Sequence, residues 1–245
     1  MKKITILLLV FLGSLCLLIG APVFAGFGDF MKSVEKVLGG GGELSEDKIV
    51  QGLKEALEIG TKNAVGNVSQ TDGYYGNPII RILLPESVQK VEGLLRTVGY
   101  GSQLDAFELS MNRAAEKAAP EAKEMFWETI RGMSFDDARK ILKGKENEAT
   151  LYFREKTWDR LSETFKPIVH ETMGTVGVTR QYQELESKVN SLPFGGKLGL
   201  DLDKYVSDGA LEGLFSMLAE EEKKIRQNPT ARVTDLLKEV FGKTN

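Results

Sequence analysis

Polar side chains interrupt the apolar stripe of one long helical run, and these are the first residues that suggest chemistry. Residues 102–132 carry apolar side chains three and four positions apart, with Asn112, Arg113 and Glu116 within or beside that stripe. An Arg buried between helices must bond to carboxylates or carbonyls, because an unpaired buried charge is costly. The same guanidinium can also clamp the carboxylate or phosphate of a ligand.

Two further groups have the same character. Thr150, Arg154 and Thr157 lie within two helical turns of three aromatic residues, and Glu222 and Arg226 are four apart, which suits an ion pair on a helix. We therefore expect these residues to form polar networks between helices. Two interpretations stay open, because such networks either fix the register of the helices or line a pocket for a small anionic ligand.

Enzymatic motifs are harder to find. His170 is the single histidine, and beside a serine or a carboxylate it would be the general base of a hydrolase or transferase. A pair among the 35 carboxylates is another route to such an enzyme. Ser45 and Lys48 have the spacing of penicillin-recognising serine enzymes, but the Ser-Asp-Asn and Lys-Thr-Gly partner motifs are missing, and an N-cap explains Ser45. A non-catalytic protein is the primary interpretation.

Composition excludes several classes of partner and cofactor. One His and one Cys in 245 residues cannot form a zinc finger or an intrachain disulfide, so neither a metal nor a cofactor is expected. A formal net charge of −3 provides no basic footprint for nucleic acid.

Residues 1–25 have the pattern of an export signal. Two lysines precede an apolar run over residues 4–20, and the sequence Val-Phe-Ala ends at Ala25, after which we expect cleavage. The mature chain would have 220 residues, and loss of the two lysines changes its net charge from −3 to −5. The only cysteine of the full sequence, Cys16, would be removed with the signal. A chain without cysteine suits the oxidising periplasm, so we expect a periplasmic location. Retention as a membrane anchor and lipidation of Cys16 are the alternatives.

Residues 26–38 predict a semi-detached amphipathic helix, which a Gly-rich joint at 39–44 separates from a helical domain at 45–245. Packing against the domain is one interpretation of this helix. The other is peripheral contact with a membrane or partner, through Phe27, Phe30 and Met31.

The domain is predicted to be all-α, with about eight to ten helices, because apolar residues recur at helical spacing and no long alternating pattern occurs. A turn-rich connection at 69–85 contains a short extended apolar piece at 79–84. Pro120 either divides the longest run or begins its second half. Helices are expected at 48–68, 86–98, 102–132, after a cap at Ser134, and at 146–165, 167–176, 179–192, 203–226 and 230–241.

Several segments together resemble one bacterial family, the domain of unknown function 4197. They are FELSMNRAAEKA at 107–118, MSFDDARKILKG at 133–144, ATLYFREKT at 149–157, YV with ALEGLF within 205–215, and EEKKIRQNP at 221–229. The resemblance covers roughly residues 49–242 and implies an exported bacterial protein with one helical domain. It implies no catalytic residue.

The sequence thus favours an exported helical domain that binds a small anionic ligand or an envelope protein. A hydrolase or transferase using His170 or a carboxylate pair is one alternative. An envelope-associated structural protein is the other.

Overall fold

The described part of the chain is built from helices. The computed structural model describes residues 46–175, 182–184, 186–188 and 200–227, and it contains no strand within these ranges. The expected all-α class is confirmed. No helix in these ranges is both long and apolar enough to cross a membrane. The predictions for residues 1–25, 26–38, 39–44 and 230–241, and for the Ser45 cap, lie outside the described residues.

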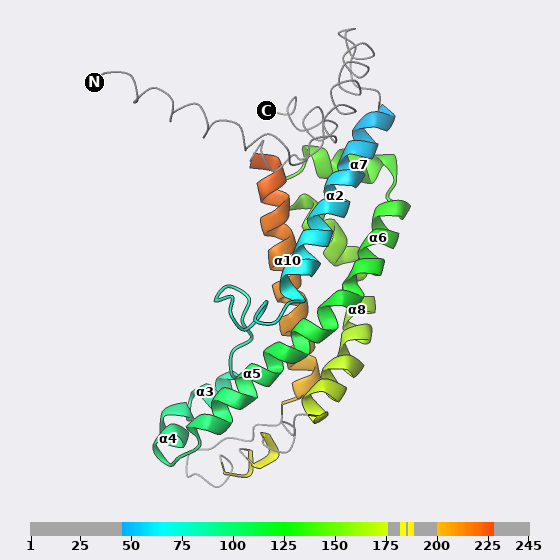
Figure 1. The fold of residues 1–245 in the computed structure, drawn as a ribbon. Coiled ribbons are helices and arrows are strands. Elements are labelled where there is room, and N and C mark those ends of the chain that lie inside the picture. The colour runs from blue at the N-terminus through cyan, green and yellow to red at the C-terminus, as the bar shows by residue number, and fades with distance from the viewer. Residues whose placement is uncertain (1–45, 176–181, 185, 189–199, 228–245) are drawn as a thin grey trace, which may run out of the picture. The chain divides into compact units, whose positions relative to one another are not determined.

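Eight α-helices and one 3-10 helix are described (Figure 1). In chain order they are α2 (Glu46–Val68), α3 (Glu86–Gln89), α4 (Glu92–Thr97), α5 (Gly101–Ala118), η1 (Ala119–Glu121), α6 (Ala122–Gly132), α7 (Phe135–Lys143), α8 (Glu148–Thr175) and α10 (Leu202–Gln227).

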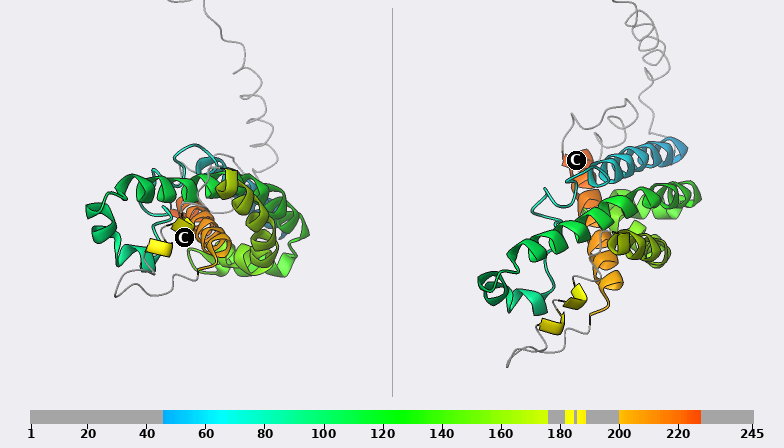
Figure 2. Two further views of the ribbon diagram at one scale, coloured as in Figure 1. Left: turned by 90° about the horizontal axis from the view of Figure 1, so that it is seen from below. Right: turned by 60° about the horizontal axis from the view of Figure 1, so that its bottom comes forward.

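Helix α10 is the central element of the domain. It packs against α8, α2 and α5, and α5 in turn packs against α8. A view almost along α10 shows the other helices arranged around it (Figure 2). Its buried residues recur at helical spacing, as Val206, Ala210, Leu214 and Leu218 show. The apolar faces of four helices therefore share one core.

Aromatic rings fill the contact between α6, α8 and α10. Phe126 meets Phe153 edge to face at a centroid distance of 5.2 Å, and meets Phe215 at 5.9 Å. Edge-to-face contacts align the positive edge of one ring with the negative face of another. These three rings fix how closely the helices approach.

Two prolines have opposite effects on the helices. Pro120 lies in η1 and separates α5 from α6, so the longest predicted run is two helices. Pro167 lies inside α8, and the predicted break between residues 165 and 167 is wrong. Both Pro167 and Glu163 are exposed, so water can solvate the Glu163 carbonyl that has lost its helical donor.

The helix ends also test the sequence predictions. Ser134 caps α7 as expected, since its hydroxyl accepts from the Asp137 amide and the Asp137 carboxylate accepts from the Ser134 amide. The single helix expected at 86–98 is wrong, because α3 and α4 are separate. Val91 interrupts them with a non-helical backbone (φ −113°, ψ 3°).

The connector, residues 69–85, joins α2 to α3 and lies against α5 and α10. Its residues 81–85 have no regular secondary structure. The Tyr74 hydroxyl donates to the Ala210 carbonyl (2.6 Å) and the Tyr205 hydroxyl to the Leu83 carbonyl (3.1 Å), so both ends are bonded to α10. Figure 1 shows it descending to α3 and α4 beside α5.

Gly213 on α10 provides the space for the connector. A Cβ at this position would lie 2.6 Å from the Tyr74 ring, whose side chain is fully buried. We expect Gly213→Ala to lower the free energy of unfolding by about 1–3 kcal/mol, as overpacking does. The matched control is Gly66→Ala at an exposed helical position with no neighbour within 4 Å, which is expected to be neutral or stabilising. Urea denaturation checks both variants, and equal effects would contradict the assignment.

Candidate functional site

Glu222 binds the start of a neighbouring helix. Its carboxylate accepts from the backbone N–H groups of Ala149 (3.0 Å) and Thr150 (2.9 Å) and from the Thr150 hydroxyl (2.9 Å). Ala149 and Thr150 are in the first turn of α8, where backbone N–H groups have no partner within the helix. Glu222 therefore caps α8 from another helix, and its negative charge suits the helix dipole.

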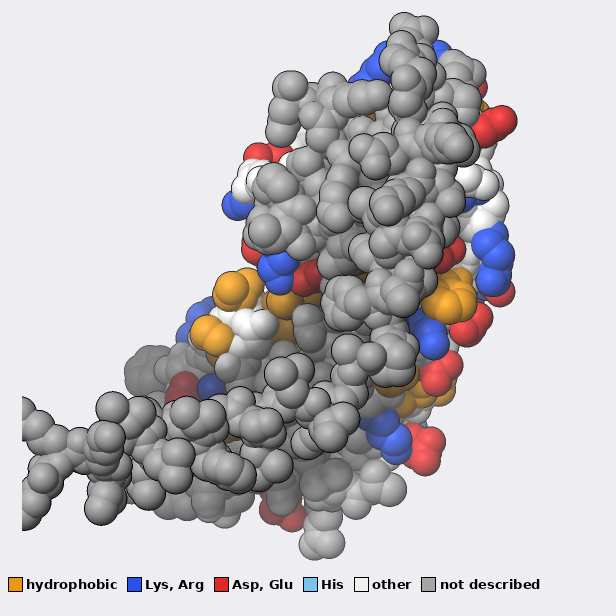
Figure 3. Space-filling view, turned by 45° about the horizontal axis from the view of Figure 1, so that its top comes forward, with side chains coloured by type: hydrophobic (Ala, Val, Ile, Leu, Met, Phe, Trp, Pro, Cys, Tyr) orange, Lys and Arg blue, Asp and Glu red, His pale blue; other side chains and the backbone are white. Residues whose placement is uncertain are grey.

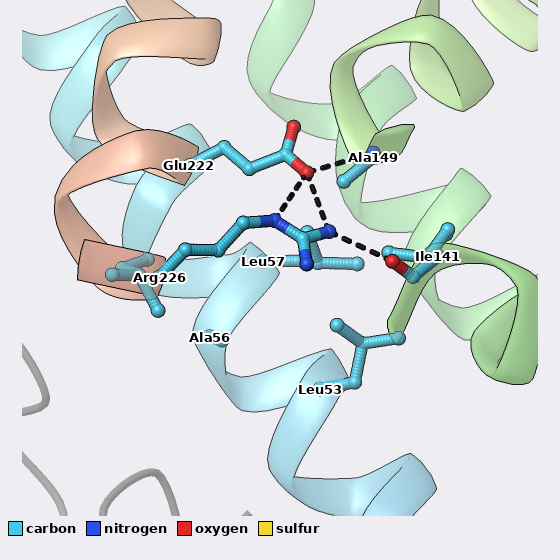
Figure 4. A pocket seen from close by; sticks show the side chains of 8 residues that line it. Leu53, Ala56, Leu57, Ile141, Ala149, Glu222 and Arg226 are labelled. Atoms are coloured by element: carbon cyan, nitrogen blue, oxygen red, sulfur yellow. Dashed lines mark hydrogen bonds and ion pairs between the residues drawn. The ribbon is translucent and has the colours of Figure 1, made fainter. Parts of the chain in front are cut away.

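Arg226 binds the end of a different helix. Its guanidinium donates to the Ile141 carbonyl in the last turn of α7 (2.8 Å) and pairs with Glu222 (2.8 Å) (Figure 4). A cation is favourable at a helix C-terminus for the same electrostatic reason. The Glu222–Arg226 pair thus bridges two helix ends of opposite polarity. The cavity beside it measures about 20 Å³, close to the volume that one water needs.

Three residues on one face of α5 bind the connector. Asn112 is fully buried, accepts from the Ile82 amide (2.9 Å) and donates to the Ile82 carbonyl (2.8 Å). The Glu108 carboxylate, one turn earlier, pairs with Arg81 (2.6 Å). Glu116, one turn later, accepts from the Tyr74 amide (3.1 Å). This polar stripe on α5 replaces the hydrogen-bonding partner that a neighbouring strand would provide.

Arg113 completes the cluster at Glu116. It pairs with Glu116 (2.6 Å) on its own helix and with Asp72 (2.7 Å) on the connector. Asp72 has a positive φ of 65°, a conformation that Asp tolerates better than most residues.

Burial, and secondarily the charge of Glu116, raises the pKa of the Tyr74 hydroxyl well above its usual range. Tyr74 is therefore a neutral hydrogen-bond donor here.

Arg154 forms an exposed cluster of its own. It makes a bidentate pair with Glu212 on α10 and lies over the Trp158 ring, 4.4 Å from its centroid. The hydrogen bond from Arg154 holds the pKa of Glu212 below its usual range. Thr157 is not part of this cluster, because its buried hydroxyl donates to the Phe153 carbonyl one turn earlier (2.7 Å).

Seven of the eight predicted residues thus fall into three groups with different partners and do not surround one site, and Thr157 bonds only within α8. Asn112, Arg113 and Glu116 bind the connector, Thr150, Glu222 and Arg226 join the ends of α7 and α8, and Arg154 pairs with Glu212. Each of the three arginines is paired with a carboxylate of the chain itself. A larger open hollow of about 430 Å³ is lined by other residues: Tyr100, Gln183, Glu184, Ser187 and Lys188.

His170 lies on the surface of α8. Its Nδ1 is 2.8 Å from the Asp203 carboxylate on α10, and its side chain is 71% exposed. Asp203 can orient the imidazole, as in catalytic dyads. Within the ranges that the structure describes, no hydroxyl or thiol is hydrogen-bonded to His170. The geometry supplies an oriented imidazole without a nucleophile bonded to it.

Sequence reasoning overlooked a group of exposed apolar side chains on the connector and α4, two segments that the short helix α3 joins. We call it the 79–98 face and define it by Ile79, Leu83, Leu94 and Val98, which are 76%, 54%, 48% and 60% exposed. In the described residues the one other large exposed hydrophobic is Leu151. On the described surface that Figure 3 shows, Lys and Arg side chains lie near Asp and Glu side chains, with apolar side chains among them. The sequence of residues 79–84 is apolar except for Arg81, so it predicted an extended apolar piece but did not show which of its side chains are exposed.

The buried and exposed glutamates of α10 provide a matched test of the clusters. Glu222→Gln removes the charge that Arg226 and the α8 amides share, and it should lower the free energy of unfolding by about 3 kcal/mol. Glu212→Gln, at a 53% exposed side chain, should cost less than about 1 kcal/mol. Urea denaturation measures both. A cost for Glu222→Gln no larger than that for Glu212→Gln would contradict the capping role.

Comparison with known proteins identifies the chain at the level of its family. No curated protein and no solved structure matches it significantly. A family model described as "Protein of unknown function (DUF4197)" matches residues 43–242, which include every cluster described above. The chain belongs to this family of unknown function, and the part of it that the structure describes is helical.

Proposed function

We propose that this protein is an exported, non-catalytic helical domain that binds a protein partner through the 79–98 face. The observation that carries the proposal is the concentration of exposed apolar residues. Four of the five large hydrophobics exposed in the described ranges lie within these twenty positions. Apolar patches on a soluble surface commonly mark interaction sites, because their burial against a partner is favourable.

The connector presents its part of this face in a fixed orientation. Ile80, Ile82 and Leu84 are at most 5% exposed, whereas Ile79 and Leu83 point outward. Successive side chains of an extended segment point to opposite sides, so buried Ile82 and Leu84 fix the outward direction of Leu83, whereas Ile79 lies in the preceding turn. A partner therefore meets side chains that are already ordered, which lowers the entropic cost of binding.

The arginine geometry favours a protein partner over a small anionic ligand. An anion would have to displace Glu116, Glu212 or Glu222 from its Arg. Glu222 also holds the start of α8, so its displacement would leave backbone N–H groups unbonded. A protein partner at the 79–98 face requires no such rearrangement.

Export is tested directly on the purified protein. The full-length chain expressed in a bacterium should be recovered from the periplasmic fraction with Gly26 as its first residue, as judged by intact mass and N-terminal sequencing. Replacing Ala25 by a bulky residue should leave the signal attached, because signal peptidase requires a small residue there. An intact Met1 start in the unaltered protein would contradict cleavage.

Partner binding is tested by photo-crosslinking in living cells. A photoreactive amino acid at position 94 should produce a discrete crosslinked species. The same probe at position 151 should give little or none, because Leu151 is on α8 and has the same 48% exposure. Equal labelling at both positions, or none at either, would contradict a specific role for the 79–98 face.

A further inference from the structure

We infer that the partner of the 79–98 face is a second copy of this chain, arranged about a twofold axis. This inference rests on the proposed function, because it names the partner for the same surface. The argument begins with the charges on and around the face.

The cations next to the face are neutralised within the chain. Arg81 pairs with Glu108 (2.6 Å), and Arg96 pairs with Glu92 (2.8 Å) and Asp105 (2.7 Å). The hydrogen bond from Arg96 also holds the pKa of Asp105 below its usual range. A face whose arginines are engaged in this way has little attraction for anionic lipid or for another polyanion.

Two residues of opposite charge, which lie between the apolar residues in the sequence, form no ion pair within the described part of the chain. Both residues, Glu86 and Lys90, are exposed, follow Leu83 and precede Leu94. In a twofold interface each surface meets itself, so residue i of one copy contacts residue j of the other and the reverse. An exposed acid and an exposed base in the segment between Leu83 and Leu94 satisfy this requirement, since Glu86 of each copy can face Lys90 of the other.

The composition of the face suits a modest interface. Stable interfaces bury about 800 Å² per partner, with an apolar centre and a polar rim. The four apolar residues supply the centre, and exposed polar neighbours such as Gln89 and Thr97 supply the rim. Gln89 donates to the Leu84 carbonyl, which ties α3 to the connector. Arg96 ties α4 to Asp105 on α5, so binding requires little reordering.

The first test is the oligomeric state of the mature chain purified from the periplasm. Sedimentation equilibrium should show a monomer–dimer equilibrium below about 100 µM, and Leu94→Asp should weaken it at least about tenfold. Leu151→Asp is the matched control and should leave the dimer unchanged. Circular dichroism confirms that each variant is folded. A monomer throughout this range, or an equal effect of the two variants, overturns the inference.

The second test uses the charges. Glu86→Lys and Lys90→Glu should each weaken the dimer severalfold, because each places like charges across the twofold axis. The double variant E86K/K90E restores both contacts and should recover the original dissociation constant. A double variant as weak as the singles overturns the pairing.

The two proposals fail in different ways. A crosslinked species from position 94 with twice the mass of the chain supports the dimer. A monomeric protein whose position 94 crosslinks to a different protein retains the proposed function and overturns this inference.

Discussion

Ile82 lies in an extended segment whose backbone groups have no strand beside them. The Asn112 side chain bonds both its N–H and its C=O (2.9 and 2.8 Å), and it does so in a site with no exposure to water. A buried backbone group without a partner costs about 1–3 kcal/mol, so the connector could not stay between α5 and α10 without these bonds. Asn is suited to this position because its amide both donates and accepts. The connector's part of the 79–98 face depends on that arrangement, because the outward direction of Leu83 follows from the inward direction of Ile82 and Leu84.

The same principle explains the second buried cluster. Glu222 and Arg226 bond backbone groups at the start of α8 and at the end of α7, which are opposite poles of two helices. A buried ion pair alone is weak evidence for stability, since desolvation offsets much of the attraction. Here both charges also satisfy backbone groups that the helices leave unbonded, so the pair specifies how α7, α8 and α10 meet. Both buried clusters use polar side chains to bind backbone.

The sequence could predict residues whose signals are local. The all-α class follows from apolar spacing, the Ser134 cap from a motif four residues long, and the division at Pro120 from its ring. It could not predict that Pro167 stays inside α8, because that depends on whether water reaches the Glu163 carbonyl. The spacing of Glu222 and Arg226 predicted their pairing, but not the partners of Glu222 more than 70 residues away. Asn112 and Glu116 were notable as polar residues on an apolar stripe, whereas their partners on the connector depend on the tertiary fold.

A binding role is also consistent with how the polar residues are used. A catalytic or ligand site requires groups whose hydrogen-bonding capacity is reserved for the substrate. Asn112, Glu116 and Glu222 instead use theirs on the chain's own backbone, and Arg113, Arg154 and Arg226 are paired with its own carboxylates. Such internal satisfaction makes the scaffold rigid while it leaves the outward apolar side chains of the connector and α4 without partners in the described residues. Because apolar burial is the main driving force of association, those side chains are where the proposed partner would gain free energy by binding.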